Sequence, residues 1–258
     1  MALASDPTLG SLPRQILILK ALFLQDLVNG PGGQRARYAL FPQLLSDQEG
    51  TSGGEPDPVP GEGSGEGFIV KKTPLSAFSR PRSNGIIAVD LRGDDALVDV
   101  AVTDGSRDIM LLASSGKAIR FRESDVRAMG RGAAGVRGIR LGEGERVISL
   151  IIVDEGDILT ATENGYGKRT PLADFRAQKR GGKGVISIKT TKRNGPVVGI
   201  LLVSEDDDLM LMTNIGKVIR MQVNSISVIS RNTQGVKLMG MDADERVAGA
   251  ARLAEKEE

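Results

Sequence analysis

The segment ILTATENGYGKRTPLADFRAQKRGGKGVISIKTTKRNGPVVGILLV, residues 158–203, decides the fold. Its apolar runs are short and rich in Val, Ile, Leu and Thr, a composition that fits buried strands better than helices. Asn164 and Gly165 separate the strand ILTAT from GKRTPL, and Asn-Gly is a strong hairpin signal because both residues tolerate positive φ. A basic loop then leads to VISIK, and a turn at 191–195 leads to VVGILLV. The pattern predicts a unit of four short strands.

The unit is repeated. A glycine preceded by basic residues and followed by an alternating apolar run recurs at Gly85, Gly135, Gly184 and Gly235, at spacings of 50, 49 and 51 residues. The string KKTPL at 71–75 and the string KRTPL at 168–172 are nearly identical. A period near 50 residues indicates a multi-stranded unit that buries its apolar face only by stacking on copies of itself. Four units of four strands predict blades arranged radially.

Composition excludes several chemistries. The chain has no Cys, His or Trp, which removes disulfides, thiolate chemistry and the commonest metal ligand and general base. The longest apolar stretch, 16–28, is interrupted by Lys20, Gln25 and Asp26 and is too short to span a bilayer. The N-terminus lacks the basic start of a secretory signal, so we expect a cytoplasmic protein without catalytic or metal-binding residues of its own.

The chain changes character near residue 67. Residues 49–67 contain seven Gly, three Pro and five acidic residues and predict a disordered linker. Residues 1–48 do not share the repeat pattern, and 16–28 predicts one short helix. Residues 1–67 hold 4 Lys/Arg and 8 Asp/Glu, whereas 68–258 hold 30 and 25, so the repeat region is mildly basic. The first repeat also lacks the strand that matches ILTAT, and the linker takes its place in the sequence.

Basic residues recur near the repeat loops and on the predicted strands. The loop 178–184 combines three cations with three glycines, which let backbone N–H groups and positive charges approach phosphate oxygens. Strand-borne cations at equivalent positions would form one track if the blades are radial; solvated turns and strand edges are the alternative reading. The candidate DNA-binding residues are Lys71, Lys72, Arg80, Arg82, Arg120, Arg122, Arg127, Arg131, Arg137, Lys168, Arg169, Lys179, Arg180, Lys183, Arg220 and Arg231. Aromatic residues are only 3% of the chain, which argues against base stacking and favours backbone contacts to duplex DNA.

The repeat region resembles the C-terminal domain of the gyrase A family of bacterial DNA gyrases. The strings that carry the resemblance are IRFRESDVRAMGRGAAGVRGIRLGEG at 119–144, ILTATENGYGKRTPL at 158–172, KGVISIKTTKRNGPVVG at 183–199 and SRNTQGVKL at 230–238. The resemblance implies a β-pinwheel whose neighbouring blades exchange strands and whose basic rim bends duplex DNA. It also implies work beside the rest of gyrase A and beside gyrase B in ATP-dependent negative supercoiling on the bacterial nucleoid. ATP and Mg²⁺ would act elsewhere in that complex.

The sequence departs from the family pattern in three ways. The family's pinwheel usually has more blades than the four found here. The family's basic heptad belongs to its first blade, whereas the similar heptad Gln178–Gly184 lies in the third unit, which leaves its wrapping role open. The regions that carry the DNA-cleaving tyrosine and the acidic metal cluster do not match, and we interpret Tyr38, which follows an arginine, as coincidental.

The resulting prediction is an all-β chain: a β-pinwheel or propeller-like array of four four-stranded blades at 68–258, forming an incomplete ring, with a mostly disordered N-terminal extension. Its predicted role is non-specific binding and wrapping of duplex DNA as part of a type II topoisomerase, with no catalysis by this chain alone. A protein-binding propeller scaffold for an acidic partner is the alternative. Residues 1–67 are either the product of a frame error or rearrangement, or a real fusion.

Overall fold

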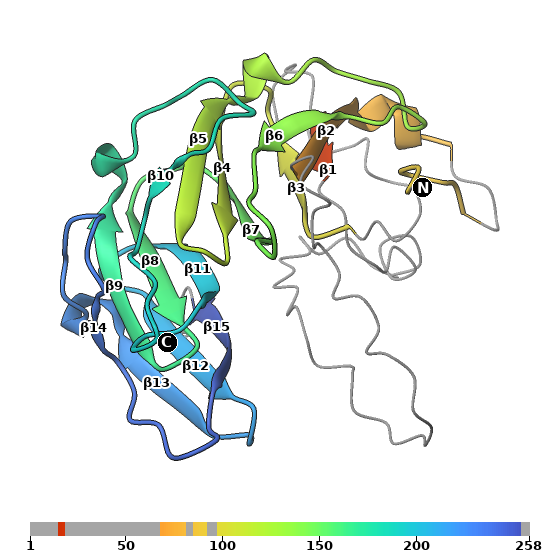
Figure 1. The fold of residues 1–258 in the computed structure, drawn as a ribbon. Coiled ribbons are helices and arrows are strands. Elements are labelled where there is room, and N and C mark those ends of the chain that lie inside the picture. Colours follow the sequence, from red (N-terminus) through yellow and green to blue (C-terminus); the bar gives the residue numbers. More distant parts are fainter. Residues whose placement is uncertain (1–14, 19–67, 81–84, 92–96, 254–258) are drawn as a thin grey trace.

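The computed structural model describes residues 15–18, 68–80, 85–91 and 97–253, and the described part is built of β-strands and short 3-10 helices (Figure 1). The strands are β1 (Gln15–Ile18), β2 (Phe68–Pro74), β3 (Val100–Thr103), β4 (Asp108–Ala113), β5 (Lys117–Arg122), β6 (Val136–Ile139), β7 (Val147–Ile152), β8 (Asp157–Thr162), β9 (Tyr166–Pro171), β10 (Val185–Ile186), β11 (Val197–Val203), β12 (Asp208–Thr213), β13 (Val218–Gln222), β14 (Val236–Lys237) and β15 (Val247–Leu253). The 3-10 helices are η1 (Leu75–Phe78), η2 (Glu123–Asp125), η3 (Leu172–Asp174) and η4 (Val223–Ser225). The all-β prediction is confirmed.

Each of the last three repeats opens with a tight hairpin. Gly116, Gly165 and Gly216 occupy the turns of the hairpins β4–β5, β8–β9 and β12–β13, with φ of 80°, 77° and 81°. Because these φ values lie in the left-handed region, glycine is the residue that adopts them without strain. The predicted turn at Asn164-Gly165 is therefore confirmed.

The sheets are assembled by strand exchange between units. The strand orders are β3-β1-β2-β6, β10-β5-β4-β7, β11-β8-β9-β14 and β13-β12-β15. The last strand added to each of the first three sheets, β6, β10 or β14, follows the turn glycine of the next unit along the chain. We call β6, β10 and β14 the donated strands. The prediction of exchanged strands is confirmed, but the fourth described sheet has three strands and not four, because it receives no donated strand.

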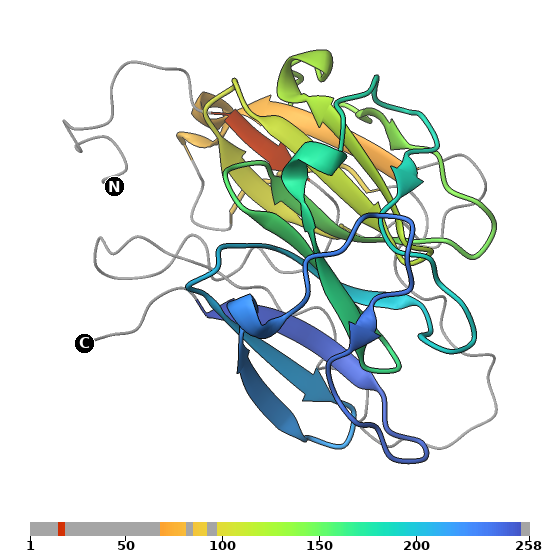
Figure 2. The ribbon, with the colours of Figure 1, turned by 90° about the vertical axis from the view of Figure 1, so that its left-hand side faces the viewer.

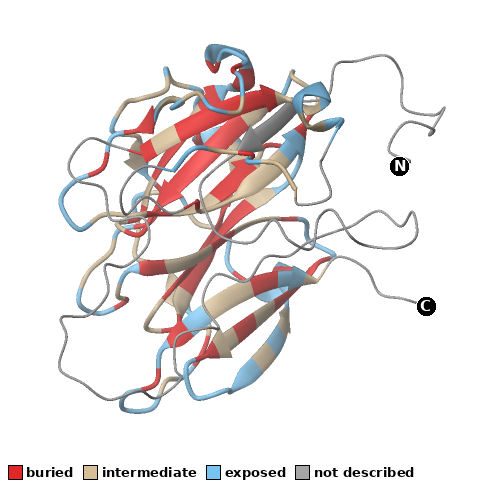
Figure 3. Ribbon diagram, turned by 90° about the vertical axis from the view of Figure 1, so that its right-hand side faces the viewer, coloured by how far each residue is buried: buried red, intermediate tan, exposed pale blue. Residues whose placement is uncertain are grey.

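The four sheets follow one another along an open arc (Figures 1 and 2). Apolar side chains fill the space between consecutive sheets, since each strand between two sheets alternates its side chains between the two faces. On β4, Ile109 and Leu111 belong to the core shared with the first sheet, whereas Met110 and Leu112 belong to the core shared with the third. The third core joins β8 to β12 and contains Leu159 and Leu209. The strands β4 and β8 of the second and third sheets are almost entirely buried, whereas β13 at the edge of the fourth sheet alternates exposed and half-buried residues (Figure 3).

The first sheet corrects two expectations. Residues 15–18 form the strand β1 and not the start of a helix, and β1 pairs with both β2 and β3. It therefore occupies the position of β4, β8 and β12, the strand that the sequence pattern treats as missing. The rest of the predicted 16–28 helix and the predicted linker 49–67 lie outside the described residues. No helix in the described part of the chain is long and apolar enough to cross a membrane.

Candidate nucleic-acid interface

Three connections lie on the outer, convex side of the arc, and we call them the outer loops (Figure 1). They are residues 126–135, 176–184 and 226–235, each lying between a 3-10 helix and a donated strand. Each ends in a glycine with positive φ, 93° at Gly135, 72° at Gly184 and 76° at Gly235. A Cβ at Gly184 would lie 2.4 Å from the Ala118 carbonyl oxygen, and one at Gly235 would lie 2.6 Å from that of Gly167. Glycine therefore lets each donated strand lie directly against the preceding unit.

One arginine in each outer loop ties that loop to its neighbour. Arg131 donates from Nη1 to the carbonyl oxygen of Ile87 at 2.5 Å, Arg180 to that of Arg137 at 3.0 Å, and Arg231 to that of Ile186 at 3.0 Å. In each case the acceptor is the second residue after the turn glycine of the preceding unit. We call Arg131, Arg180 and Arg231 the latch arginines. Their half-buried guanidinium groups fix the position of each outer loop against the preceding unit.

Exposed cations surround the latch arginine Arg180 at the junction of the second and third units. The backbone N–H of Arg140 donates to Gly182 O at 2.9 Å, which places β6 and its flank beside the loop 178–184. Arg137, Lys179 and Lys183 are exposed there, and in the described structure their side chains form no hydrogen bond or ion pair. A cluster of free cations on a convex surface attracts a polyanion, because neutralised phosphates release their counterions.

The predicted site residues separate into groups by burial. The exposed ones are Arg80, Arg122, Arg127, Arg137, Lys179, Lys183 and Arg220; Arg120, Arg131, Arg180 and Arg231 are half-buried; Lys71, Lys72, Lys168 and Arg169 are buried. Arg82 lies outside the described residues. Three of these seven exposed candidates, Arg127, Lys179 and Lys183, lie in the outer loops, and Arg137 lies on the donated strand β6 beside them.

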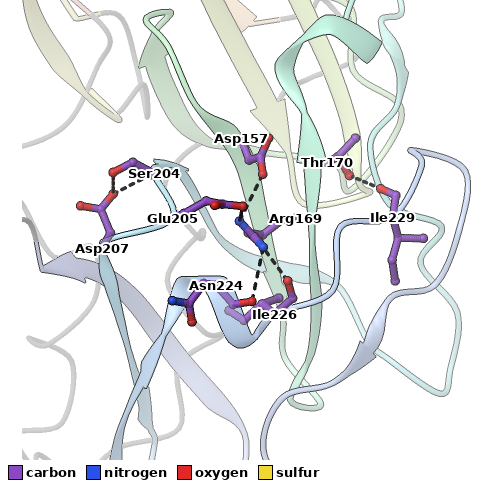
Figure 4. Close-up of polar contacts among 9 residues, drawn as sticks. All are labelled: Asp157, Arg169, Thr170, Ser204, Glu205, Asp207, Asn224, Ile226 and Ile229. Carbon is purple, nitrogen blue, oxygen red and sulfur yellow. Dashed lines mark hydrogen bonds and ion pairs between the residues drawn. The ribbon is translucent and has the colours of Figure 1, made fainter.

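The strand-borne cations do not form the single surface track that the sequence predicted. Lys72, Arg120, Arg169 and Arg220 occupy one repeated position, and we call them the clamp cations. Arg169 donates from Nε to Ile226 O at 2.9 Å and pairs through Nη1 with Asp157 at 3.4 Å (Figure 4). Arg120 likewise pairs with Asp108 at 2.8 Å and donates to Phe175 O at 3.3 Å. The side chains of Lys72, Arg120 and Arg169 thus point into the interface with the next unit, where they donate to its carbonyl oxygens.

Two lysines form a second set of buried contacts between units. Lys168 donates to the carbonyl oxygens of Ser230 at 2.6 Å and Arg231 at 2.5 Å, and Lys71 donates to that of Arg131. Burial, reinforced by the positive charge of Arg231 and opposed by Asp174, lowers the pKa of Lys168 from 10.5 to about 8. Burial also lowers the pKa of Lys71. These lysine contacts fix the outer loops to the strands of the preceding unit.

Replacing Lys168 by Met should change how the stability of the chain depends on pH. Between about pH 8 and 10.5 the unfolded chain retains the Lys168 proton and the folded chain releases it. The unfolding free energy of the parent therefore rises with pH in this window, by at most about 3 kcal/mol, and the variant lacks this rise. Urea denaturation of both proteins at pH 7.5, 9 and 10.5 measures the difference; a constant difference would contradict the shifted pKa.

Sequence reasoning missed further exposed cations, which include Lys189, Lys237, Arg193 and, in the outer loop 176–184, Arg176. Lys189 lies five residues after its turn glycine, as Arg140 does, and its N–H donates to Thr233 O at 2.8 Å. Lys237 lies two residues after its turn glycine, as Arg137 does. Arg193 lies 4.9 Å from the Tyr166 ring centre. Position relative to the turn glycine is the signal that would have found the first two.

Fold and site together define the class: a propeller-like array of strand-exchanging β-blades with basic loops on its outer side. The family model described as DNA gyrase C-terminal domain, beta-propeller, matches residues 69–104, 107–154, 156–204 and 207–254, and the chain belongs to this family. The four matched segments coincide with the four repeats read from the sequence.

Similar proteins agree with this assignment. The gyrase A protein of Klebsiella oxytoca is 52% identical over 187 residues, which are 72% of this chain and 21% of that protein. The gyrase A protein of Pseudomonas aeruginosa is 50% identical over 72% of this chain and 20% of its own length. The chain thus spans about a fifth of these curated relatives. A solved DNA gyrase A C-terminal domain matches in fold with a TM-score of 0.68, 22% identity, and coverage of 95% of this chain and 67% of that one. The C-terminal domain of DNA topoisomerase IV also gives 0.68, at 28% identity, covering 73% of this chain and 59% of that one.

Proposed function

We propose that this chain binds duplex DNA without sequence preference and bends it around the outer loops. The observation that supports the proposal best is the repetition of exposed cations and left-handed glycines at successive unit junctions. Because the junctions are spaced along an arc, a duplex that contacts them in turn has to follow the same curve. Binding of this kind depends on phosphate charge and on the bendability of the DNA.

The described surface contains the kinds of group that bind a DNA backbone, and its described helices are too short to lie along a major groove. Base-reading proteins usually insert a helix or a ribbon of side chains into the major groove. The described helices of this chain are 3-10 turns of three or four residues. Phosphate contacts by Lys, Arg and backbone N–H groups position a protein on DNA without specifying a sequence.

We further propose that the chain works as the DNA-wrapping part of gyrase A in the bacterial cytoplasm, on the chromosome. Its partners would be the remainder of gyrase A and the gyrase B protein, which would supply DNA cleavage, ATP hydrolysis and the Mg²⁺ that both need. The contribution of this chain would be the curvature that directs strand passage toward negative supercoiling.

Replacing Arg137, Lys179 and Lys183 by alanine tests the surface. These three side chains are exposed and free in the described structure, so the fold should be retained. Arg180 is kept because it is a latch arginine. We expect affinity for a random-sequence duplex to fall by about 10- to 100-fold, and the slope of log affinity against log salt to decrease by about 3. Fluorescence anisotropy measures both.

The matched control replaces Arg107, Arg246 and Arg252 by alanine, which removes the same charge from exposed positions outside the outer loops. This control should bind nearly as the parent does. Equal losses in the two variants would show that only net charge matters, and no loss in either would make the outer loops ordinary solvated turns.

A further inference from the structure

The array has one unused donor segment and one unused acceptor edge. Residues 86–89 follow Gly85 as β6, β10 and β14 follow their own turn glycines, yet in the described structure they pair with no strand. At the other end, among the described residues, β13 pairs with β12 alone, whereas its counterparts β2, β5 and β9 each carry a donated strand. The same chain therefore exposes both halves of a joint that it forms three times internally.

Two sets of equivalent glycines show which turns are covered by a neighbouring unit and which are open. A Cβ at Gly116 would lie 2.2 Å from Ile188 O, and one at Gly165 would lie 2.7 Å from Met239 O, because the next unit covers both turns. A Cβ at Gly216, the equivalent turn of the fourth unit, would meet no atom of the described residues within 4 Å. Among the turn glycines that precede donor segments, Gly85 is likewise open, whereas Gly135, Gly184 and Gly235 are closely packed.

Side chains at the two free ends are more exposed than their internal equivalents. Ile87 in the donor segment is 76% exposed, and Val218 on β13 is 52% exposed. The side chain of the clamp cation Arg220 is 59% exposed, whereas that of Arg169 is 4% exposed. Arg169 meets the carbonyl oxygens of the next 3-10 turn, and Arg220 pairs only with Asp208 in the described structure.

We propose that the chain assembles head to tail, with residues 85–89 of one copy adding to β13 of another. The internal joints give the register. Val185 lies opposite Ala118 and Ile186 opposite Lys117, so Ile86 should lie opposite Val218 and Ile87 opposite Lys217. The η1 turn of the incoming copy would then supply carbonyl oxygens to Arg220.

The occupant is a second copy because the two halves of the joint lie at opposite ends of the open arc (Figure 1). Such a contact uses different surfaces on the two partners, so it is not limited to a dimer, and its repetition produces either a closed ring or a growing chain of copies. Added strands satisfy backbone N–H and C=O groups that an exposed sheet edge leaves unpaired.

Substitution of the two open glycines tests the joint. Gly85→Asn and Gly216→Asn each add a Cβ that the single chain accommodates but that the joint would place against backbone, as at Gly116 and Gly184. Asn tolerates left-handed φ better than most residues. Gly144→Asn is the matched control, because Gly144 has a φ of 68°, no atom within 4 Å of an added Cβ, and lies away from both ends.

Sedimentation velocity without DNA should show concentration-dependent association for the parent and for Gly144→Asn. Each end variant alone should associate about 10- to 100-fold more weakly, the effect expected of a forced steric overlap. An equimolar mixture of the two end variants should form a dimer and stop there, because one intact donor then meets one intact acceptor.

Three results would overturn the proposal. A parent that remains monomeric at high concentration shows that the ends do not meet. A Gly85→Asn variant that still dimerises alone shows a symmetric contact between β13 edges. A mixture that fails to dimerise, although both variants retain the circular dichroism spectrum of the parent, shows that the two ends are not complementary.

Discussion

Affinity of the chain for a random-sequence duplex should fall by about 10³–10⁵ between 50 and 200 mM salt. This magnitude corresponds to about 6–10 neutralised phosphates, a number that the exposed cations of the outer loops and their flanks supply when a duplex contacts several junctions in turn. Short duplexes that reach only one junction should show a smaller slope. Titration by fluorescence anisotropy at several salt concentrations, with duplexes of increasing length, measures the slope directly.

A slope that is independent of duplex length would contradict wrapping, because it would mean that one junction makes all the contacts. A flat salt response would contradict phosphate binding altogether and would favour a surface that recognises an acidic protein by shape. Comparing duplexes of equal length with different sequences separates charge from base readout, and equal affinities are expected.

The fold follows from the sequence because the repeat is explicit in it. Four turn glycines at a near-constant spacing and a hairpin signal at Asn164-Gly165 specify four units of short strands. The sequence pattern does not show which strand completes which sheet. The strands β10 and β14 are two residues long, and each belongs to a sheet of another unit. Only the resemblance to the gyrase family predicted this exchange.

The first sheet contains a strand that the sequence pattern did not predict. The strand β1 precedes its partner β2 by about fifty residues, and its sequence QILI matches a helix-forming stretch as well as a strand. Pairing with β2 and β3 decides between the two, and this is a tertiary effect that local propensity does not contain. The isolated apolar stretch 16–28 therefore predicted a helix.

The candidate site was only partly predictable for a different reason. Sequence gives the positions of cations but not the direction of their side chains. Loop cations such as Lys179 and Lys183 are exposed, as charged residues in glycine-rich loops usually are. Arg120 and Arg169, at the repeated strand position, instead face the next unit. The sequence contains a signal for the ion pairs at this position: each of Arg120, Arg169 and Arg220 lies 12 residues after an aspartate on the neighbouring strand. A repeated Asp–Arg pair on adjacent strands indicates a structural ion pair.

Two of the clamp cations, Arg169 and Arg220, give a prediction with an internal control, because they occupy the same repeated position and differ in burial. Arg169→Ala should lower the free energy of unfolding by about 3–5 kcal/mol, the range expected when one partner of a buried ion pair is removed. The side chain of Arg169 is 4% exposed, and its loss leaves Asp157 and the carbonyl oxygens of Asn224 and Ile226 without their donor (Figure 4). Because Asp157 keeps some access to water, we expect the lower end of this range.

Arg220→Ala removes the same residue type from the same repeated position and should lower the free energy of unfolding by less, about 1–2 kcal/mol, because the Arg220 side chain is 59% exposed and contacts no neighbouring unit in the described structure. The loss that remains comes from Asp208, whose side chain is 10% exposed and loses its charged partner. Urea denaturation of both variants, at a protein concentration low enough to prevent association, measures the contrast. Amide exchange gives an independent readout: Arg169→Ala should speed exchange at Ile229, whose N–H donates to Arg169 O, while Arg220→Ala should not. Equal losses of stability in the two variants would show that the arginine acts within its own hairpin, and that the contacts between units do not depend on it.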